Sequence, residues 1–259
     1  MKRLLYIALT VLVASCAGEP QRGPSADTGT IPGDVGEPRN RARLHTELAS
    51  LYYSRGNLAV ALEELRLATE AEPSYALAHS MFGLVYMELR ENKLAQESFD
   101  RALKLAPDNA DISHNYGSFL CQTERETQSI KFFLQAIRNP LYQTPWRSYS
   151  AAGVCSMRAN KLKDAEEFFQ RALKLEPDEP AALVQLAQIR YRQGNFGEAR
   201  RMVARFNRLY PQNPESLWLA LRVERKLGER VAEASFATQL RRNFPDSKEF
   251  QALQRGEFD

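Results

Sequence analysis

Histidine and cysteine are the residues of this 259-residue chain best suited to chemistry, because both ligate metals and cysteine also forms disulfides. His45, His79 and His114 are spaced 34 and 35 residues apart, and Cys121 and Cys155 are 34 apart. A structural zinc site usually draws its ligands from pairs only about two to five residues apart. A spacing of about 34 residues indicates a repeated unit of that length, and we expect the histidines to pack between helices and to bind no metal.

Motifs of the common enzyme classes are missing from the sequence. It contains no glycine-rich phosphate loop, no His-Glu-x-x-His, no Cys-x-x-Cys and no serine in a nucleophile elbow. We therefore expect a protein that is not an enzyme and that uses no cofactor and no small-molecule substrate.

Prolines mark the repeated unit. Pro73, Pro107, Pro177, Pro211 and Pro245 are spaced 34, 70, 34 and 34 residues apart, and 70 is two periods with two extra residues. A period of about 34 residues that closes near a proline is the signature of the tetratricopeptide repeat (TPR), a helix-turn-helix unit. The sequence thus predicts an all-α fold, a right-handed superhelical solenoid of about six TPRs.

Small and large residues recur at fixed positions, counted from the first residue of each repeat. Position 8 is Ala or Gly in five repeats, and position 24 is Leu or Phe in four. Small residues let the two helices of a repeat approach closely, and we expect the aromatic residue at position 24 to fill the space toward the next repeat. Because one repeat cannot bury its apolar face alone, the stack is the folding unit.

The repeats are assigned to residues 42–75, 76–109, 110–145, 146–179, 180–213 and 214–247, and a capping tail at 248–259 is expected to form a short helix. The third repeat holds the two extra residues, and 139–146 is expected to be a longer loop. The sixth has Glu224 and Glu233 at positions that are usually apolar or small. We expect this more polar repeat to shield the open end of the stack.

Cys121 and Cys155 are residues 12 and 10 of adjacent first helices. An oxidising compartment would permit a disulfide between them. Since these two positions face somewhat different directions on their helices, we favour two inert, partly buried thiols over a bond.

The first residues resemble the leader of a bacterial lipoprotein. After a basic start, residues 4–14 are apolar, a run too short to cross a bilayer but long enough for the centre of a secretory signal. Residues 13–16 (Val-Ala-Ser-Cys) resemble a lipobox, at which the leader is removed and the cysteine acylated. We therefore expect a signal peptide at 1–15 and a lipid on Cys16. The alternative is an ordinary signal peptide with an incidental cysteine.

Residues 16–41 are expected to form an acylated, flexible tether, because the stretch is rich in Gly, Pro, Ser, Asp and Thr and cannot bury enough surface to fold. Lipoproteins that keep an aspartate after the cysteine usually stay in the inner membrane. Ala17 stands there instead, so we expect the outer membrane, with the folded part facing the periplasm.

Partners of a TPR stack bind in the concave groove, to which positions 2, 5, 9, 12 and 13 of the first helices are expected to point. Apolar residues there are unfavourable without a ligand, and methionine adapts to peptides. These positions include Tyr53, Leu77, Leu84 and Met87, and Asn115 lies nearby. For Leu84 and Met87, packing between helices is an equally good explanation. Asn115 is left open between ligand binding and structure.

Charge is unevenly distributed. Residues 42–109 hold seven Lys/Arg and ten Asp/Glu, whereas residues 186–230 hold ten Lys/Arg and four Asp/Glu. A basic end on a tethered protein suits an acidic partner or anionic lipid. Nucleic acid is not expected as a partner outside the cytoplasm.

A lipobox leader, a polar tether and six TPRs together resemble the pilotin lipoproteins of type IV pilus biogenesis, the PilF/PilW family. The residues that carry this resemblance are His114-Asn115-Tyr116-Gly117-Ser118-Phe119-Leu120-Cys121 and the stretch from Gln239 to Phe250. The resemblance extends over essentially the whole chain.

The resemblance implies a partner and a site. Such pilotins bring the pilus secretin to the outer membrane or help it to form multimers there, in support of twitching motility. The docking surface implied for the first repeats corresponds here to Tyr52, Tyr53, Leu77, Leu84 and Met87. The alternative is a TPR lipoprotein of another envelope machine, either for β-barrel assembly or for cell-wall enzymes.

Overall fold

Thirteen α-helices and no strand make up residues 37–258, the part of the chain that the computed structural model describes. Cys16, the leader and the tether up to residue 36 lie outside the described residues. The helices are α1 Pro38–Ser54, α2 Leu58–Ala71, α3 Ala76–Glu88, α4 Asn92–Leu105, α5 Ala110–Gln122, α6 Glu126–Arg138, α7 Pro145–Arg158, α8 Leu162–Leu175, α9 Pro180–Arg192, α10 Phe196–Leu209, α11 Pro214–Leu227, α12 Arg230–Asn243 and α13 Lys248–Arg255.

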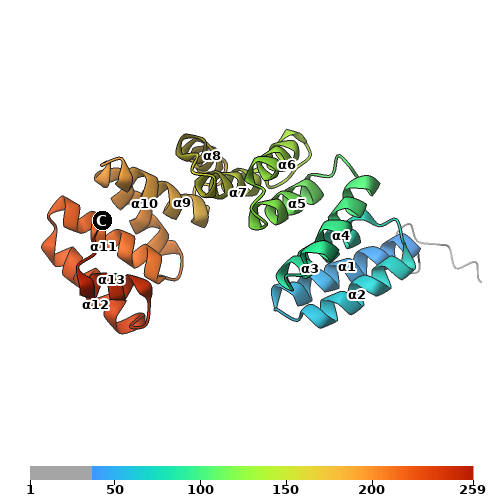
Figure 1. Cartoon of the computed structure of the whole chain (residues 1–259), viewed down its shortest axis with the longest axis horizontal. Helices are drawn as coiled ribbons and strands as arrows, with labels where there is room; N and C mark the ends of the chain where they lie inside the picture. The colour runs from blue at the N-terminus through green and yellow to red at the C-terminus, as the bar shows by residue number, and fades with distance from the viewer. Residues whose placement is uncertain (1–36, 259) are drawn as a thin grey trace, which may run out of the picture. The chain divides into compact units, whose positions relative to one another are not determined.

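The helices pack in consecutive pairs, α1 with α2 through α11 with α12, as Figure 1 shows. Within the described residues no helix contacts another that is more than two places away along the chain. First helices of successive repeats contact one another, from α1 and α3 to α9 and α11, whereas second helices of successive repeats do not. The expected all-α TPR solenoid is therefore confirmed, with the first helices on its inner side.

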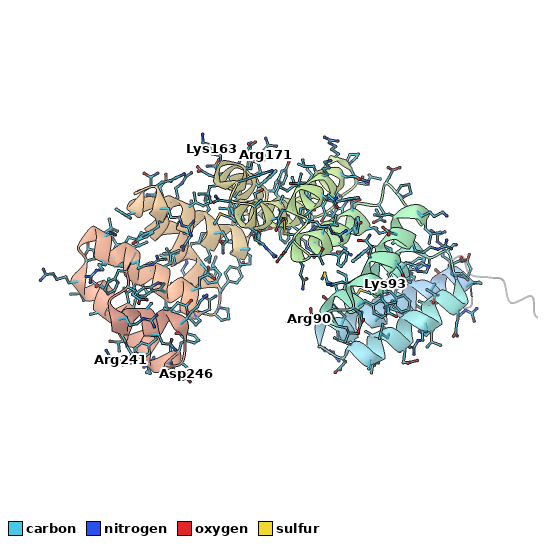
Figure 2. The ribbon with its side chains drawn as sticks, in the orientation of Figure 1. Arg90, Lys93, Lys163, Arg171, Arg241 and Asp246 are labelled. Carbon is cyan, nitrogen blue, oxygen red and sulfur yellow. A yellow bond between two sulfur atoms is a disulfide. The ribbon has the colours of Figure 1, made fainter. Side chains whose placement is uncertain are left out.

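Charged side chains on the second helices face solvent. Lys93 on α4, Lys163 and Arg171 on α8, and Arg241 on α12 are all exposed (Figure 2). Because a second helix packs against its own first helix and that of the next repeat and exposes its remaining face to solvent, these positions tolerate charge.

Positions 8 and 24 are in close contact in repeats two, three and four. A Cβ added at Gly83 would lie 2.7 Å from the ring of Phe99, and one at Gly153 would lie 2.5 Å from the ring of Phe169. The aromatic residue at position 24 therefore packs on its own repeat, in addition to the expected contact toward the next repeat. It reaches the next repeat as well, since the Phe99 ring lies 5.4 Å from that of Phe119.

The turn inside each repeat contains one residue with a positive φ, always at position 15. Glycine fills this position in three repeats, and the other three force a side chain into the left-handed region, which costs about 1–2 kcal/mol. The six residues are Gly56, Arg90, Glu124, Asn160, Gly194 and Gly228.

The two extra residues of the third repeat lengthen the linker between α6 and α7, as expected. It spans residues 139–144, whereas the linkers between the other repeats have four residues. Tyr142 in this loop is buried against Ala110 and Ala136, and its hydroxyl accepts a hydrogen bond from Ser148 (3.2 Å). Asn139 donates to the carbonyl of Asp108 (2.9 Å). The loop is thus fixed to α5, α6 and α7 and to the linker that precedes α5.

The start of α1 and the place of Glu224 differ from the expectation, whereas α13 is the short helix expected within 248–259. Helix α1 begins at Pro38, so residues 38–41, expected in the tether, are helical, and proline suits the first helical turn. At the other end α13 covers the stack through a cluster that includes Leu217, Leu240 and Phe250. Glu224 does not shield the end; it is buried and pairs with Arg200 (2.9 Å).

Candidate protein-binding surface

Positions 2, 5, 9 and 12 of each first helix form one stripe, because residues three and seven apart lie on the same face of an α-helix. Since the first helices contact one another along the stack, their stripes combine into a continuous surface, here called the concave surface. It has three regions of different character: proximal on α1, α3 and α5, central on α5, α7 and α9, and distal on α9 and α11.

The stripe of α3 is the most apolar part of the proximal region. It consists of Leu77, Ser80, Leu84 and Met87. Leu84 packs against the cores of both the first two repeats and the next, whereas Leu77 is 37% exposed. Ser80 is buried and accepts a hydrogen bond from Asn115 of α5 (3.1 Å), which ties the stripes of α3 and α5 together.

Two tyrosines of α1 complete the proximal region. Tyr52 and Tyr53 are half-buried and pack against the same core as Leu84. Burial, and then the negative charge of Glu88, raises the pKa of the Tyr53 hydroxyl, so this group stays a neutral hydrogen-bond donor at neutral pH. The structure therefore brings Tyr53, Leu84 and Met87 into one neighbourhood, while Leu77 lies two helical turns from Leu84.

Packing between helices accounts for some of the predicted binding residues of the proximal region. Leu84 and Met87 are both half-buried and contact core residues, and Tyr116 is buried, with its hydroxyl accepting from Gln96 (2.7 Å). Asn115 has a structural bond to Ser80 and remains half-exposed. A binding role for Leu84, Met87 and Asn115 stays a prediction.

The central region is a hollow of about 500 Å³ between α5, α7 and α9. Most of its lining residues occupy the groove positions of repeats three to five, including Ser118, Arg147 and Val154. Trp146, Arg158 and Glu179 also line it and were not singled out from the sequence. The period itself contained the signal for Arg147 and Arg158, at positions 2 and 13. Only the tertiary structure places Trp146, at the start of α7, and Glu179, just before α9, at the hollow.

The carboxylate in this hollow has a structural role. Glu179 is buried at the N-terminus of α9, where it accepts hydrogen bonds from the backbone N–H groups of Ala181 and Ala182 and from the Ser150 hydroxyl (2.8 Å). Helix N-termini favour negative charge and side-chain acceptors. Its charge is thus compensated by the helix, and we assign it no catalytic role.

His114 is a neutral packing residue. Its Nδ1 lies 2.9 Å from Ser148 Oγ, and its ring lies 5.6 Å from that of Phe133. Burial, together with the positive charge of Arg147, lowers its pKa to about 4. His45 pairs with Glu64 (2.7 Å), and His79 contacts the carbonyl of Pro73 (2.9 Å). No group of three or more His, Cys, Asp or Glu side chains in residues 37–258 is placed to hold a metal ion.

Cys121 and Cys155 form a disulfide, which corrects the preference for two free thiols. Their Cα atoms lie 5.8 Å apart, within the usual range for a disulfide. Positions 12 and 10 face different ways on one helix, but α5 and α7 are in contact and present these two positions to each other. The bond lies at the edge of the central hollow, which Cys121 lines.

The distal region has a different composition. Its stripe on α11 consists of Glu215, Trp218, Arg222 and Arg225, and α9 contributes Tyr191. The segment that follows α13 lies against it: the ring of Phe258 is stacked on that of Trp218 at 5.6 Å between centroids. This part of the concave surface is therefore covered by the chain itself.

The repeats, their packing and the concave surface define a tetratricopeptide-repeat protein. Family models described as tetratricopeptide repeat match residues 42–75, 80–142 and 156–222. Such repeats form scaffolds for protein interaction. Within residues 37–258 none of the helices combines the length and the apolar character needed to cross a membrane.

Similarity to individual proteins identifies the family. The chain is 32% identical to the type IV pilus assembly protein PilF of Pseudomonas aeruginosa over 231 residues, 89% of this chain and 91% of that protein. The solved structure of P. aeruginosa PilF matches with a TM-score of 0.79 and 30% identity, over 85% of this chain and 99% of that one. PilW, a widely conserved type IV pilus biogenesis factor, matches with a TM-score of 0.73 and 31% identity, over 82% and 98%. The chain belongs to the PilF/PilW family of type IV pilus biogenesis proteins.

Proposed function

We propose that this protein is a lipid-anchored scaffold that binds the pilus secretin through the proximal region and promotes its multimerisation in the outer membrane. The observation that carries the proposal is the similarity to P. aeruginosa PilF, which extends over 89% of this chain. The family supplies the process, type IV pilus biogenesis. The secretin as partner is our addition.

The proximal region supports the choice of docking surface. Leu77, Leu84 and Met87 place apolar side chains on a surface that no described segment covers, and the bond between Asn115 and Ser80 holds α3 and α5 together beneath them. An apolar stripe between polar neighbours is the usual surface for a protein segment. The central hollow, with Arg147 and Arg158, adjoins it through α5 and extends the surface available to a long segment.

The membrane anchor is part of the proposal. The lipobox-like residues 13–16 support acylation of Cys16, and Ala17 supports sorting to the outer membrane, where the secretin multimer is located. Labelling cells with radioactive palmitate tests this: the wild type should carry label and float with outer-membrane vesicles, and Cys16→Ser should carry none. Label in the Cys16→Ser protein would refute acylation at this residue.

Secretin assembly is the main test. Outer-membrane fractions from strains with and without this gene are compared on a gel that preserves the secretin multimer. We expect multimers to disappear or to move to the inner membrane without the gene, while the secretin monomer remains. Unchanged multimers in the outer membrane would refute the secretin assignment and leave the fold and family intact.

A matched pair of leucines tests the surface. Leu77 on α3 is 37% exposed and Leu94 on α4 is 40% exposed, so Lys at either position costs the fold a similar amount. Leu77→Lys should lower secretin multimers strongly, since it places a charge on the apolar stripe, and Leu94→Lys should leave them unchanged. Equal effects of the two substitutions would show that the proximal region is not the docking surface.

A further inference from the structure

The chain turns back onto its own concave surface after α13. Helix α13 ends at Arg255, and Gly256 follows with a φ of +72°, a conformation that side chains with a Cβ rarely adopt. The backbone N–H of Glu257 donates to the carbonyl of Ala252 (2.9 Å), and its carboxylate pairs with Arg255 (2.8 Å). These bonds fix the direction in which the next residue, Phe258, leaves the helix.

Phe258 makes three contacts of different kinds with the distal region. The guanidinium carbon of Arg225 lies 3.9 Å from the centroid of its ring. The Trp218 ring is stacked on it, with an interplanar angle of 25°. The hydroxyl of Tyr191 donates to its backbone carbonyl (3.4 Å). A cation over an aromatic face and a stacked aromatic pair both contribute beyond simple burial.

Arg222 lies beneath these contacts with unused hydrogen-bonding capacity. It is only 8% exposed, and its guanidinium carbon lies 4.8 Å from the ring of Tyr191 and 5.6 Å from that of Trp218. Its Nε is buried and has no hydrogen-bond partner among residues 37–258. A buried guanidinium N–H without an acceptor favours a negatively charged ligand close by.

The distal region and the segment that follows α13 carry charges of opposite sign. Residues 186–230, which include α9 and α11, hold ten Lys/Arg and four Asp/Glu. The covering residues 256–258 read Gly-Glu-Phe and are followed in the sequence by Asp259, so the phenylalanine stands between two acidic residues. The aromatic residue of the segment therefore contacts the distal region directly, and the acidic residues beside it have the opposite charge to residues 186–230, although the Glu257 carboxylate itself pairs with Arg255.

We propose that the distal region is a recognition site for a phenylalanine flanked by acidic residues, and that the chain's own segment 256–258 occupies it as an intramolecular ligand. The segment follows α13 directly, so its effective concentration at the site is high, on the order of millimolar or above. An external segment of the same chemistry binds only after the chain's own segment is displaced. This inference is independent of the proposed function, because it concerns α9 and α11 and not the proximal region.

Peptide binding tests the proposal. The probe is a fluorescein-labelled peptide Arg-Gly-Glu-Phe-Asp, added to the full chain and to a chain that ends at Arg255, both purified in detergent. Fluorescence polarisation should show binding to the shortened chain and at least about tenfold weaker binding to the full chain. Phe258→Ala in the full chain should restore binding. Equal binding to the full and shortened chains, or none to a shortened chain that keeps its circular dichroism spectrum, would overturn the proposal.

Matched variants locate the site. In the shortened chain Trp218→Ala should remove peptide binding, whereas Trp146→Ala, a tryptophan of the central hollow, should leave it unchanged. A peptide with alanine in place of phenylalanine should not bind. Loss of binding through Trp146→Ala and not through Trp218→Ala would place the peptide in the central hollow and contradict the assignment.

Tryptophan fluorescence tests the intramolecular contact without any ligand. Trp146→Phe leaves Trp218 as the sole tryptophan, since the chain has two. In that background Phe258→Ala should shift the emission maximum to longer wavelength, because Trp218 loses the ring stacked on it. An unchanged spectrum would mean that Phe258 does not cover Trp218 in solution.

Discussion

Repeats two and six present the same four positions to the concave surface with opposite chemistry. On α3 these positions hold Leu, Ser, Leu and Met, at residues 77, 80, 84 and 87; on α11 they hold Glu, Trp, Arg and Arg, at residues 215, 218, 222 and 225. The apolar stripe is open, whereas the aromatic and cationic stripe is covered by the chain's own segment.

The comparison shows that the groove positions of a repeat can change in chemistry while its contact between helices is kept, even though Leu84 and Met87 also touch the core. Positions 8 and 24 form the contact between helices, and the groove positions vary around them. In a solenoid each repeat contacts only its neighbours, so the surface of one repeat can change at little cost to the others. The separation of packing from recognition is partial in repeats two and six, and we expect it to be weaker still in the central repeats.

The disulfide should show the largest departure from the separation of packing and recognition positions. Cys121 stands at a groove position, and yet its bond closes a loop of 34 residues and so stabilises the fold. On chain-entropy grounds, replacing both cysteines with alanine should lower the free energy of unfolding by about 3–4 kcal/mol. Urea unfolding of the oxidised wild type and the double variant measures this. Two free thiols in the unreduced wild type, by mass spectrometry after alkylation, would contradict the bond itself.

His114 should show the next largest departure from that separation, because it stands at a groove position of the third repeat and is nevertheless a buried, neutral packing residue. Its pKa is lowered to about 4 in the folded chain, so below about pH 6.5 only the unfolded chain gains a proton there. Stability should therefore be highest above pH 6.5 and fall by about 2–3 kcal/mol as the pH is lowered to 4. His114→Gln should flatten this part of the curve in urea unfolding. A parallel curve for the variant would assign the loss to other groups.

Gly83 tests the packing side of the comparison. A Cβ there would lie 2.7 Å from the Phe99 ring, so Gly83→Ala should lower the free energy of unfolding by about 1–3 kcal/mol. Repeat one carries Ala49 and Leu65 at these two positions. Adding Phe99→Leu to Gly83→Ala should therefore recover part of the loss. If the double variant is as unstable as the sum of the single variants, positions 8 and 24 are not coupled.

An exchange of stripe residues tests the recognition side. Leu84→Arg puts the residue of repeat six into repeat two and should weaken secretin binding by at least about tenfold, or about 1.4 kcal/mol. The reciprocal Arg222→Leu should leave secretin binding unchanged. Co-purification with the secretin measures the binding of both variants, and circular dichroism tests whether each variant is folded. A loss with Arg222→Leu alone would move the docking surface to the distal region.

The turn residue at position 15 should give the smallest effect. Arg90 has a φ of 61°, whereas repeat six has Gly228 there (the Arg90 side chain is labelled in Figure 2). Arg90→Gly should raise the free energy of unfolding by about 0.5 kcal/mol, since relief of the left-handed conformation is partly offset by the flexibility of glycine. A lower midpoint in thermal unfolding would show that the Arg90 side chain contributes more than its backbone costs.

The sequence by itself determined the class of fold and, to within one residue, where the first helices of repeats two to six begin. A 34-residue period with fixed small and aromatic positions allows one arrangement of helices, because the packing rule is local and is repeated along the chain. The groove positions followed from the same period, which is why residues such as Leu77 and Leu84 could be placed on first helices before any coordinates.

Only the tertiary structure decided what depends on contacts between repeats. The disulfide was not expected because the helical positions of Cys121 and Cys155 do not show how α5 and α7 are rotated against each other. Burial of Glu224 against Arg200, and the covering of Trp218 by Phe258, join residues 24 and 40 apart through a fold that the local pattern leaves open. A repeat pattern encodes how neighbouring helices pack, and the end of the chain and the side chains that meet across repeats obey no such periodic rule.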